Sequence, residues 1–148
     1  MVTKYQKRIS GPLLDRIDIH IEVPRVNYEK LSGDRVSESS DAIRARVQAA
    51  RNIQNTRFSG NGSSDIVCNA DMRVGEIRQF CRLQDEGQSL MRAAMTQLNL
   101  SARAYHRILK LARTIADLAG CEEIQSMHLA EALHLRPSEV DAEHDVMG

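Results

Sequence analysis

The stretch Ser101-Ala-Arg-Ala-Tyr-His-Arg-Ile-Leu-Lys-Leu-Ala-Arg-Thr-Ile-Ala-Asp-Leu-Ala-Gly120 has the clearest helical pattern in the 148-residue sequence. At 3.6 residues per turn, its apolar side chains cover one half of a helical wheel, and its polar side chains share an arc of roughly a third. Ser101 is a favourable N-cap residue and Gly120 a favourable stop. The pattern predicts a helix from Ala102 to about Ala119. The polar arc contains Arg103, His106, Arg107, Lys110, Arg113, Thr114 and Asp117.

Weaker helical patterns flank this segment on both sides. The helices that they predict cover about residues 41–56, 71–81, 85–98 and 127–135. Ser39 or Ser40 is expected to cap the first of these helices, and Ser126 the last. The apolar residues of helix 41–56 that are expected to face the core are Ile43, Val47, Ala50 and Ile53.

The composition fits a helical protein and excludes several other classes. The formal net charge is zero, so bulk charge gives no reason to expect nucleic-acid or membrane binding. Aromatic residues make up only 3% of the sequence. We find no apolar run long enough for a membrane span and no signal-peptide pattern, and we expect a reduced, cytoplasmic setting. The three cysteines form no CxxC pair, and the five histidines have no metal-ligand spacing, so no metal site is expected.

The stretch from Ser10 to Pro24 has a different pattern. Pro12 suits the first position of a short helix that Ser10 can cap. Apolar and polar residues then alternate, which predicts a strand. A single strand leaves its backbone groups unpaired, and a stable sheet needs three or more strands. The strand is therefore expected to belong to a larger sheet. The alternating residues are Ile17, Asp18, Ile19, His20, Ile21, Glu22 and Val23.

These patterns predict a mainly α fold, a bundle of four to five helices preceded by an orphan strand segment. The predicted parts are a strand module at 1–24, a linker at 25–40, a helical domain at 41–136, and an acidic, disordered tail at 137–148. The glycines of loop 59–65 are not followed by the lysine that a phosphate-binding loop requires, so we interpret this segment as a plain loop.

Two stretches carry a resemblance to a known family. Ser10-Gly-Pro-Leu-Leu-Asp-Arg-Ile-Asp18 and the segment Leu100–Gly120 resemble the C-terminal portion of magnesium-chelatase-like AAA+ ATPases, in particular the bacterial competence-associated, helicase-type branch. The ending Ile124-Gln-Ser-Met-His-Leu-Ala-Glu-Ala-Leu133 is similar to the same family. The resemblance extends from Tyr5 to Pro137 and is loose over residues 25–100.

The resemblance implies a role for each of two arginines. Arg16, in the Leu-Leu-Asp-Arg motif, would be the arginine finger, and Arg103, in the Ser-Ala-Arg motif, would be the sensor-2 arginine. Residues 1–24 would then be the C-terminal end of the AAA+ core, which contains the arginine-finger helix and the last strand. Residues 41–136 would form the helical lid. Arg103 could contact the nucleotide bound by its own subunit or the nucleotide bound by a neighbouring subunit, and the sequence leaves both possibilities open.

The resemblance also implies cofactors and partners. The parent protein would use ATP and Mg²⁺, act in a homo-oligomeric ring of neighbouring subunits, and act on DNA, away from membranes. The Walker A and Walker B motifs of the family do not occur in this sequence, so the chain alone should bind neither cofactor and should be inactive. Arginine suits the expected chemistry because a guanidinium stays charged and pairs two phosphate oxygens at once.

Two other functions remain open on the sequence. One is a self-contained nucleic-acid-binding module that uses the arginines of helix 41–56 and the basic arc of 103–113, although scarce aromatic residues argue against base stacking. The other is an oligomerisation domain. On either alternative Arg16 is an ordinary arginine, exposed or paired with Asp15 or Asp18. The residues interpreted as a solvated face are Arg107, Lys110 and Arg113.

Overall fold

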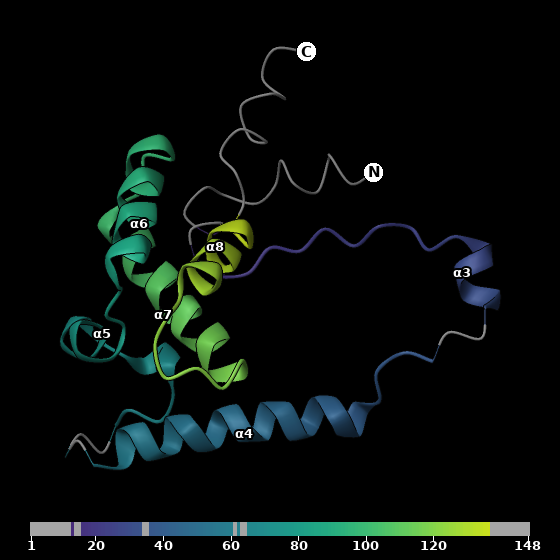
Figure 1. The fold of residues 1–148 in the computed structure, drawn as a ribbon, viewed down its shortest axis with the longest axis horizontal. Coiled ribbons are helices and arrows are strands. Elements are labelled where there is room, and N and C mark those ends of the chain that lie inside the picture. The colour runs from purple at the N-terminus through teal and green to yellow at the C-terminus, as the bar shows by residue number, and fades with distance from the viewer. Residues whose placement is uncertain (1–12, 14–15, 34–35, 61, 63–64, 137–148) are drawn as a thin grey trace.

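The computed structural model describes residues 13, 16–33, 36–60, 62 and 65–136, and within these it is mainly helical, as the sequence predicts (Figure 1). An isolated bridge joins Leu83 to Ile124, but the described residues contain no sheet. The predicted helix after Ser10 and the predicted tail at 137–148 lie largely or wholly outside the described residues. The helices are α3 (Tyr28–Ser32), α4 (Ser40–Ser59), α5 (Val74–Phe80), α6 (Asp85–Gln97), α7 (Ala102–Leu118) and α8 (Ser126–His134), with a 3₁₀ turn, η1 (Asn69–Asp71).

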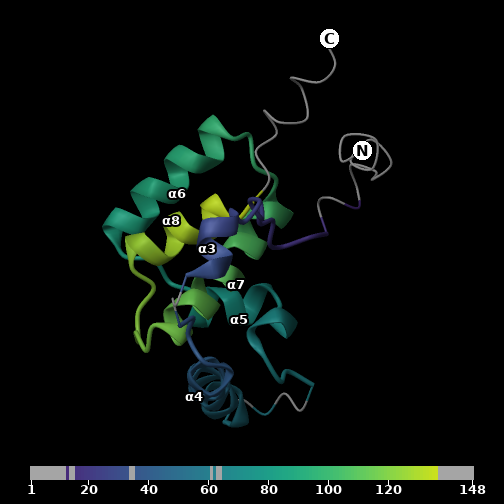
Figure 2. The same ribbon diagram turned by 90° about the vertical axis from the view of Figure 1, so that its right-hand side faces the viewer.

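Helix α7 is the centre of the fold. It packs against α8, α4, α5 and η1, while α6 packs against α8. In both ribbon views α4 lies on the side of α7 away from α6 (Figures 1 and 2). Ala112 and Ala116 are fully buried, and such small side chains allow neighbouring helices to approach closely. The larger buried apolar residues around them are Met72, Ile77, Met91, Ile108, Leu109, Ile124 and Leu129.

Several helix ends confirm the sequence prediction. Ser39 caps α4, because its Oγ accepts a hydrogen bond from the Ala42 N–H at 3.2 Å. Asn99 follows α6 with a φ of 48°, and Gly120 follows α7 with a φ of 69°. Both residues adopt the left-handed conformation that ends helices, for which glycine and asparagine are favoured.

The start of α8 differs from the prediction. Ser126 is the first residue of the helix and not its cap. Instead, the backbone N–H of Gln125 donates to Nδ1 of His128 at 3.0 Å. This is the reach-back half of a capping box, a role that Glu or Gln usually fills. His128 is buried, so this bond also gives its ring nitrogen a partner.

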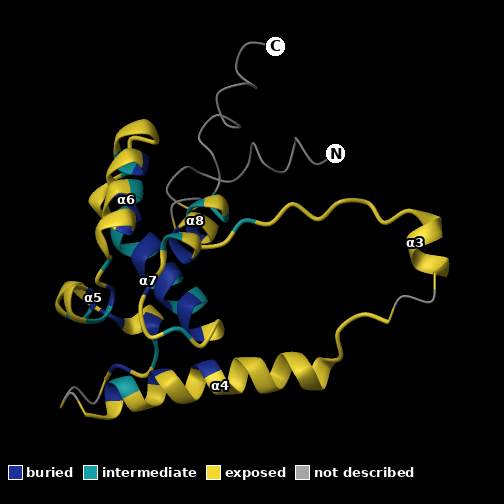
Figure 3. Cartoon of the chain, viewed as in Figure 1, coloured by how far each residue is buried: buried dark blue, intermediate teal, exposed yellow. Residues whose placement is uncertain are grey.

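The predicted apolar stripe of α4 is only partly buried. Ala50 faces the core as expected, but Ile43, Val47 and Ile53 are each about two-fifths exposed, at 42%, 41% and 38%. Figure 3 shows the first half of α4 exposed along its length. The residues of α4 that are buried are Ala50, Gln54 and Phe58. The stripe prediction is wrong for the other three: Ile43 and Val47 lie in the N-terminal half of α4, which buries no residue, and Ile53 lies to one side of the face that carries Ala50, Gln54 and Phe58.

The segment 17–23 forms no strand and pairs with no other strand in the described part of the chain. Ile21 and Val23 are 71% and 82% exposed, so the alternating pattern has no sheet to pack against. The chain then runs away from the bundle to α3 and returns to α4 (Figure 1). α3 lies in the predicted linker and buries no residue. The division into 1–24, 25–40 and 41–136 stays a prediction.

A buried ion cluster, formed by Arg57, Asp117 and Arg113, joins α4 to α7. The two Nη atoms of Arg57 donate to the two carboxylate oxygens of Asp117, at 2.8 and 2.6 Å. Nε of Arg113 donates to the same carboxylate at 3.2 Å. The side chains are 11%, 0% and 4% exposed, in the order just given, so these charges are almost completely removed from water.

Neutral groups complete the hydrogen bonding of this cluster. Nδ2 of Asn69 donates to Asp117 at 2.8 Å, and the Asn69 backbone N–H donates to Gln54 Oε1 at 2.9 Å. Arg113 also donates to the backbone carbonyls of Cys121 and Glu122, both at 2.8 Å. These carbonyls lie just beyond the C-terminal end of α7, where a cation is favoured. The two carbonyls therefore stabilise the positive charge of Arg113, although the cluster contains only one carboxylate for two arginines.

This cluster corrects the prediction for Arg113. The helical wheel places it on a solvated face, yet the structure buries it. The reason is that α4, η1 and the loop before α8 cover the part of the polar arc that carries Arg113 and Asp117. Arg57, which the sequence places on the basic face of helix 41–56, is drawn inward by the same carboxylate.

We expect Asp117→Ala to lower the free energy of unfolding by about 3–5 kcal/mol, because it leaves two buried guanidinium groups without their counter-charge. The measurement is urea denaturation followed by circular dichroism. The matched control is Asp41→Ala, which breaks an exposed i,i+3 pair with Arg44 and should cost much less. Equal losses in the two variants would contradict the structural role of Asp117.

Cys81 should be the least reactive of the three thiols. It is 3% exposed, and burial raises its pKa to about 11, with the charge of nearby Arg113 opposing part of that effect. Cys68 and Cys121 are half-buried. At pH 8 we expect iodoacetamide to modify these two and to spare Cys81 until denaturant is added, as read by peptide mass spectrometry. Equal labelling of all three in native protein would contradict this packing.

Candidate functional site

The N-terminal turn of α7 carries the first candidate residue, Arg103. Ser101 caps the turn as predicted, with its Oγ accepting from the Ala104 N–H at 3.1 Å. The first turn contains no acidic residue, and its free backbone N–H groups favour an anion. Arg103 is exposed, and its side chain makes no hydrogen bond or ion pair within the described residues. Its guanidinium is therefore available to a ligand or a partner.

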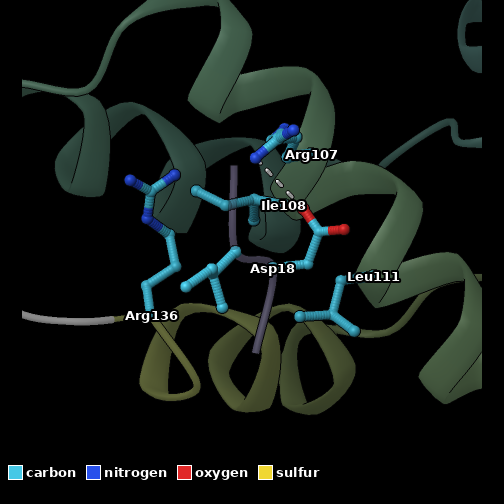
Figure 4. Close-up of a pocket in the computed structure, with 6 residues that line it drawn as sticks. Asp18, Arg107, Ile108, Leu111 and Arg136 are labelled. Carbon is cyan, nitrogen blue, oxygen red and sulfur yellow. Dashed lines mark ion pairs between the residues drawn. The ribbon is translucent and has the colours of Figure 1, made fainter. Parts of the chain in front are cut away.

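The second candidate, Arg16, precedes a segment that touches the bundle. Arg16 is exposed, and its backbone N–H donates to the carbonyl of Leu13 at 3.1 Å. Asp15, one expected pairing partner, lies outside the described residues. Asp18, the other expected partner, forms its ion pair with Arg107 of α7 instead, at 3.5 Å (Figure 4). The pairing of Arg16 with Asp18 is therefore not observed.

Residues 17–20, here called the docked segment, meet both α7 and the end of α8. Ile17 and Asp18 line a small pocket whose other walls come from α7 and from Arg136 (Figure 4). The backbone N–H of His20 donates to the carbonyl of Leu135 at 2.7 Å. The α7 residues that line the pocket are Arg107, Ile108 and Leu111.

The docked segment connects the chain near Arg16 to the helix that carries Arg103. Arg107 follows Arg103 by one helical turn, so the two lie on the same face. Asp18, which contacts Arg107, follows Arg16 by two residues in the chain. The sequence singled out both arginines but not the Asp18–Arg107 contact, because helical periodicity carries no information about a pair so distant in the chain.

The basic surfaces suggested by the sequence are partly neutralised. Arg44 pairs with Asp41, and Arg46 pairs with Glu38, whose pKa is lowered by that hydrogen bond. Lys110 donates to the backbone carbonyl of Ala70 at 2.9 Å. With Arg57 and Arg113 also buried in the ion cluster, both proposed nucleic-acid surfaces lose much of their free charge. The nucleic-acid-binding alternative is weakened accordingly.

The described residues lack two kinds of feature, a metal-binding cluster and a membrane-spanning helix. No group of three or more His, Cys, Asp or Glu side chains in the described part of the chain is arranged to hold a metal ion. Within the same residues, no helix has the length and apolarity needed to span a lipid bilayer.

The sequence matches two families of known proteins. Residues 37–136 match the family described as magnesium chelatase, subunit ChlI C-terminal, and residues 1–31 match magnesium chelatase, subunit ChlI. The competence protein ComM of Haemophilus influenzae is 44% identical over 137 residues, which cover 91% of this chain and 25% of that protein. The uncharacterised protein YifB of Escherichia coli is 40% identical over 134 residues, which cover 90% and 25%. The chain thus spans about a quarter of the length of these relatives.

The cap that orients the first turn of α7 can be tested separately. We expect Ser101→Ala to lower the free energy of unfolding by about 1 kcal/mol, because the Ala104 N–H loses its acceptor, and Ser101→Asp to retain most of the stability. Thermal or urea unfolding measures both. The control is Ser126→Ala, since the sequence predicts a cap there and the structure shows none. A larger loss at Ser126 than at Ser101 would contradict the assigned caps.

Proposed function

The chain belongs to the magnesium chelatase family, and from that premise we propose that it supplies the arginine finger and the helical lid of an ATPase that works as a ring. Arg16 is the proposed finger and Arg103 the proposed sensor-2 residue. The observation that carries the proposal is the docked segment, which links the chain next to Arg16 to the helix that presents Arg103.

The environments of the two arginines support these roles. Hydrolysis of ATP builds negative charge on the oxygens of the γ-phosphate, and an arginine finger that meets this charge accelerates the reaction by about 10³–10⁵-fold. Such a finger must be exposed and must not already be paired within its own chain. Arg16 and Arg103 are both exposed and make no side-chain ion pair within the described residues, whereas Arg57 and Arg113 are buried in the ion cluster.

The groups that bind ATP and Mg²⁺ would belong to the rest of the parent protein. ATP and Mg²⁺ are its proposed cofactors, and neighbouring subunits of a homo-oligomeric ring are its proposed partners. We propose DNA as its substrate on the family resemblance alone, and the cytoplasm as its location. The 148-residue chain lacks the phosphate-binding loop and the magnesium-binding acids of such enzymes, so by itself it should not hydrolyse ATP.

The test uses the full-length protein that contains this chain. We expect Arg16→Ala to lower ATP turnover by about 10³-fold or more while ATP affinity stays close to that of the unmodified protein. Arg16→Lys should restore little, because lysine cannot form the two-pronged contact. Arg103→Ala should also lower turnover. Steady-state kinetics and nucleotide binding provide both measurements.

The matched control is Arg92→Ala, which removes an exposed arginine from α6, on the far side of α7 from α4. Its turnover should equal that of the unmodified protein. Normal turnover in Arg16→Ala would rule out the finger assignment, and normal turnover in Arg103→Ala at all ATP concentrations would rule out the sensor assignment. ATP hydrolysis by the 148-residue chain alone would contradict the proposal that the ATP- and Mg²⁺-binding groups belong to the rest of the parent protein.

A further inference from the structure

We propose that Asp18 and Arg107 are positioning residues that fix the segment following Arg16 to α7, so that a movement of α7 is transmitted to Arg16. This inference rests on the proposed function, in which Arg103 on α7 responds to nucleotide and Arg16 acts as the finger. It adds a physical link between the two arginines within a single subunit.

Three different contacts hold the docked segment. The carboxylate of Asp18 pairs with the guanidinium of Arg107 at 3.5 Å. Ile17 lines a small pocket together with Ile108 and Leu111 of α7 and with Arg136. The His20 N–H donates to a backbone carbonyl at the end of α8 at 2.7 Å. An ion pair, a shared pocket wall and a backbone hydrogen bond within four residues define one position of this segment against the lid.

Among the described residues, those that make this contact are 17–20, which directly follow Arg16. Asp18 is half exposed, with 55% of its side chain accessible, and Arg107 is 24% accessible, so their contact covers part of both. Beyond His20 the chain leaves the bundle, and Ile21, Val23 and Val26 are largely exposed. Of residues 16–23 only His20 is half-buried, and Figure 3 shows the chain beyond it exposed as far as α3. The attachment therefore acts on the part of the chain that carries Arg16 and leaves the following residues free.

The distances are short enough for motion to be transmitted. Arg103 and Arg107 are one turn apart on a continuous helix, a rise of about 6 Å. Arg16 and Asp18 are separated by two peptide units, at most about 7 Å. A rotation of α7 that moves Arg103 must also move Arg107, and the ion pair then displaces the chain next to Arg16. A subunit in a ring would thereby relay its own nucleotide state to the site that its finger serves.

The contact is also weak enough to open. The ion pair is partly exposed and longer than a direct hydrogen bond. Nε2 of His20 is buried and makes no hydrogen bond within the described residues, which disfavours the docked position. A contact that is only modestly favourable can form in one nucleotide state and release in another, as a positioning switch requires.

The docked contact is tested first in the 148-residue chain, without nucleotide. We expect the His20 amide, which donates to Leu135, to exchange with solvent deuterium more slowly than the amides of Ile21 and Glu22. Asp18→Asn and Arg107→Gln should each speed His20 exchange by about two- to five-fold, the range expected for a partly exposed ion pair. Arg92→Gln is the control and should leave it unchanged. His20 exchange as fast as that of Ile21 in the unmodified chain would overturn the proposal.

The second measurement uses the full-length protein. Asp18→Asn and Arg107→Gln should lower kcat for ATP hydrolysis by about 10- to 100-fold, because a small misplacement of a catalytic group is costly, with little change in KM. The charge-swapped double variant Asp18→Arg with Arg107→Asp should recover part of that loss. A swap that recovers nothing, or single variants with normal kcat, would overturn the positioning role.

These outcomes separate this inference from the proposed function. Normal ATP turnover in Arg16→Ala would rule out the assignment of Arg16 as the finger. The Asp18–Arg107 contact would then have no finger to position, whatever the exchange rate of the His20 amide. Loss of turnover in Arg16→Ala together with normal kcat in the Asp18 and Arg107 variants keeps the proposed function and removes only the positioning role.

Discussion

The carboxylate of Asp117, held between the guanidinium groups of Arg57 and Arg113, is the interaction on which the rest of the structure depends. It joins α4 to α7 and, through the second arginine, to the loop that leads into α8. A different alignment of these helices would leave at least one charge buried without compensation, which is far more costly than a poorly packed methyl group. The cluster therefore restricts the helical bundle to one arrangement, and the apolar core fills the space that this arrangement leaves.

The helices could be predicted because their determinants are local. Apolar residues at helical spacing, capping serines and left-handed stops all act within a few residues, and they placed α4, α6 and α7 within a few positions of their observed ends. The prediction for Arg113 is wrong because a helical wheel assumes a core on one side, whereas α7 is covered on several. The i,i+4 spacing of Arg113 and Asp117 is a signal in the sequence, because it fits an ion pair as well as a solvated face.

The candidate site was predictable only in part, because motifs identify single residues but not the contacts between distant parts of the chain. Arg16 and Arg103 were identified by the motifs that contain them, and those motifs carry the family resemblance. The contacts that lie near these residues are long-range: Asp18 pairs with Arg107 across most of the chain, and Ile17 lines a pocket with α7 residues and Arg136 only once the helices have packed. Hydrophobic spacing shows which face of α4 is apolar, but it cannot show that the other helices cover only Ala50, Gln54 and Phe58 of this helix.

The one-sided attachment of α4 has a mechanical consequence. This helix of 20 residues is about 30 Å long, and its buried residues begin at Ala50, so about 15 Å of stiff rod extends beyond its anchor. A rod clamped at one end is a lever arm. A tilt of about ten degrees at the clamp moves the free tip by about 2–3 Å, since each residue adds about 1.5 Å of length. The ion cluster holds α4 at Arg57, within its buried half, so the N-terminal tip moves farthest when the helix tilts about that half.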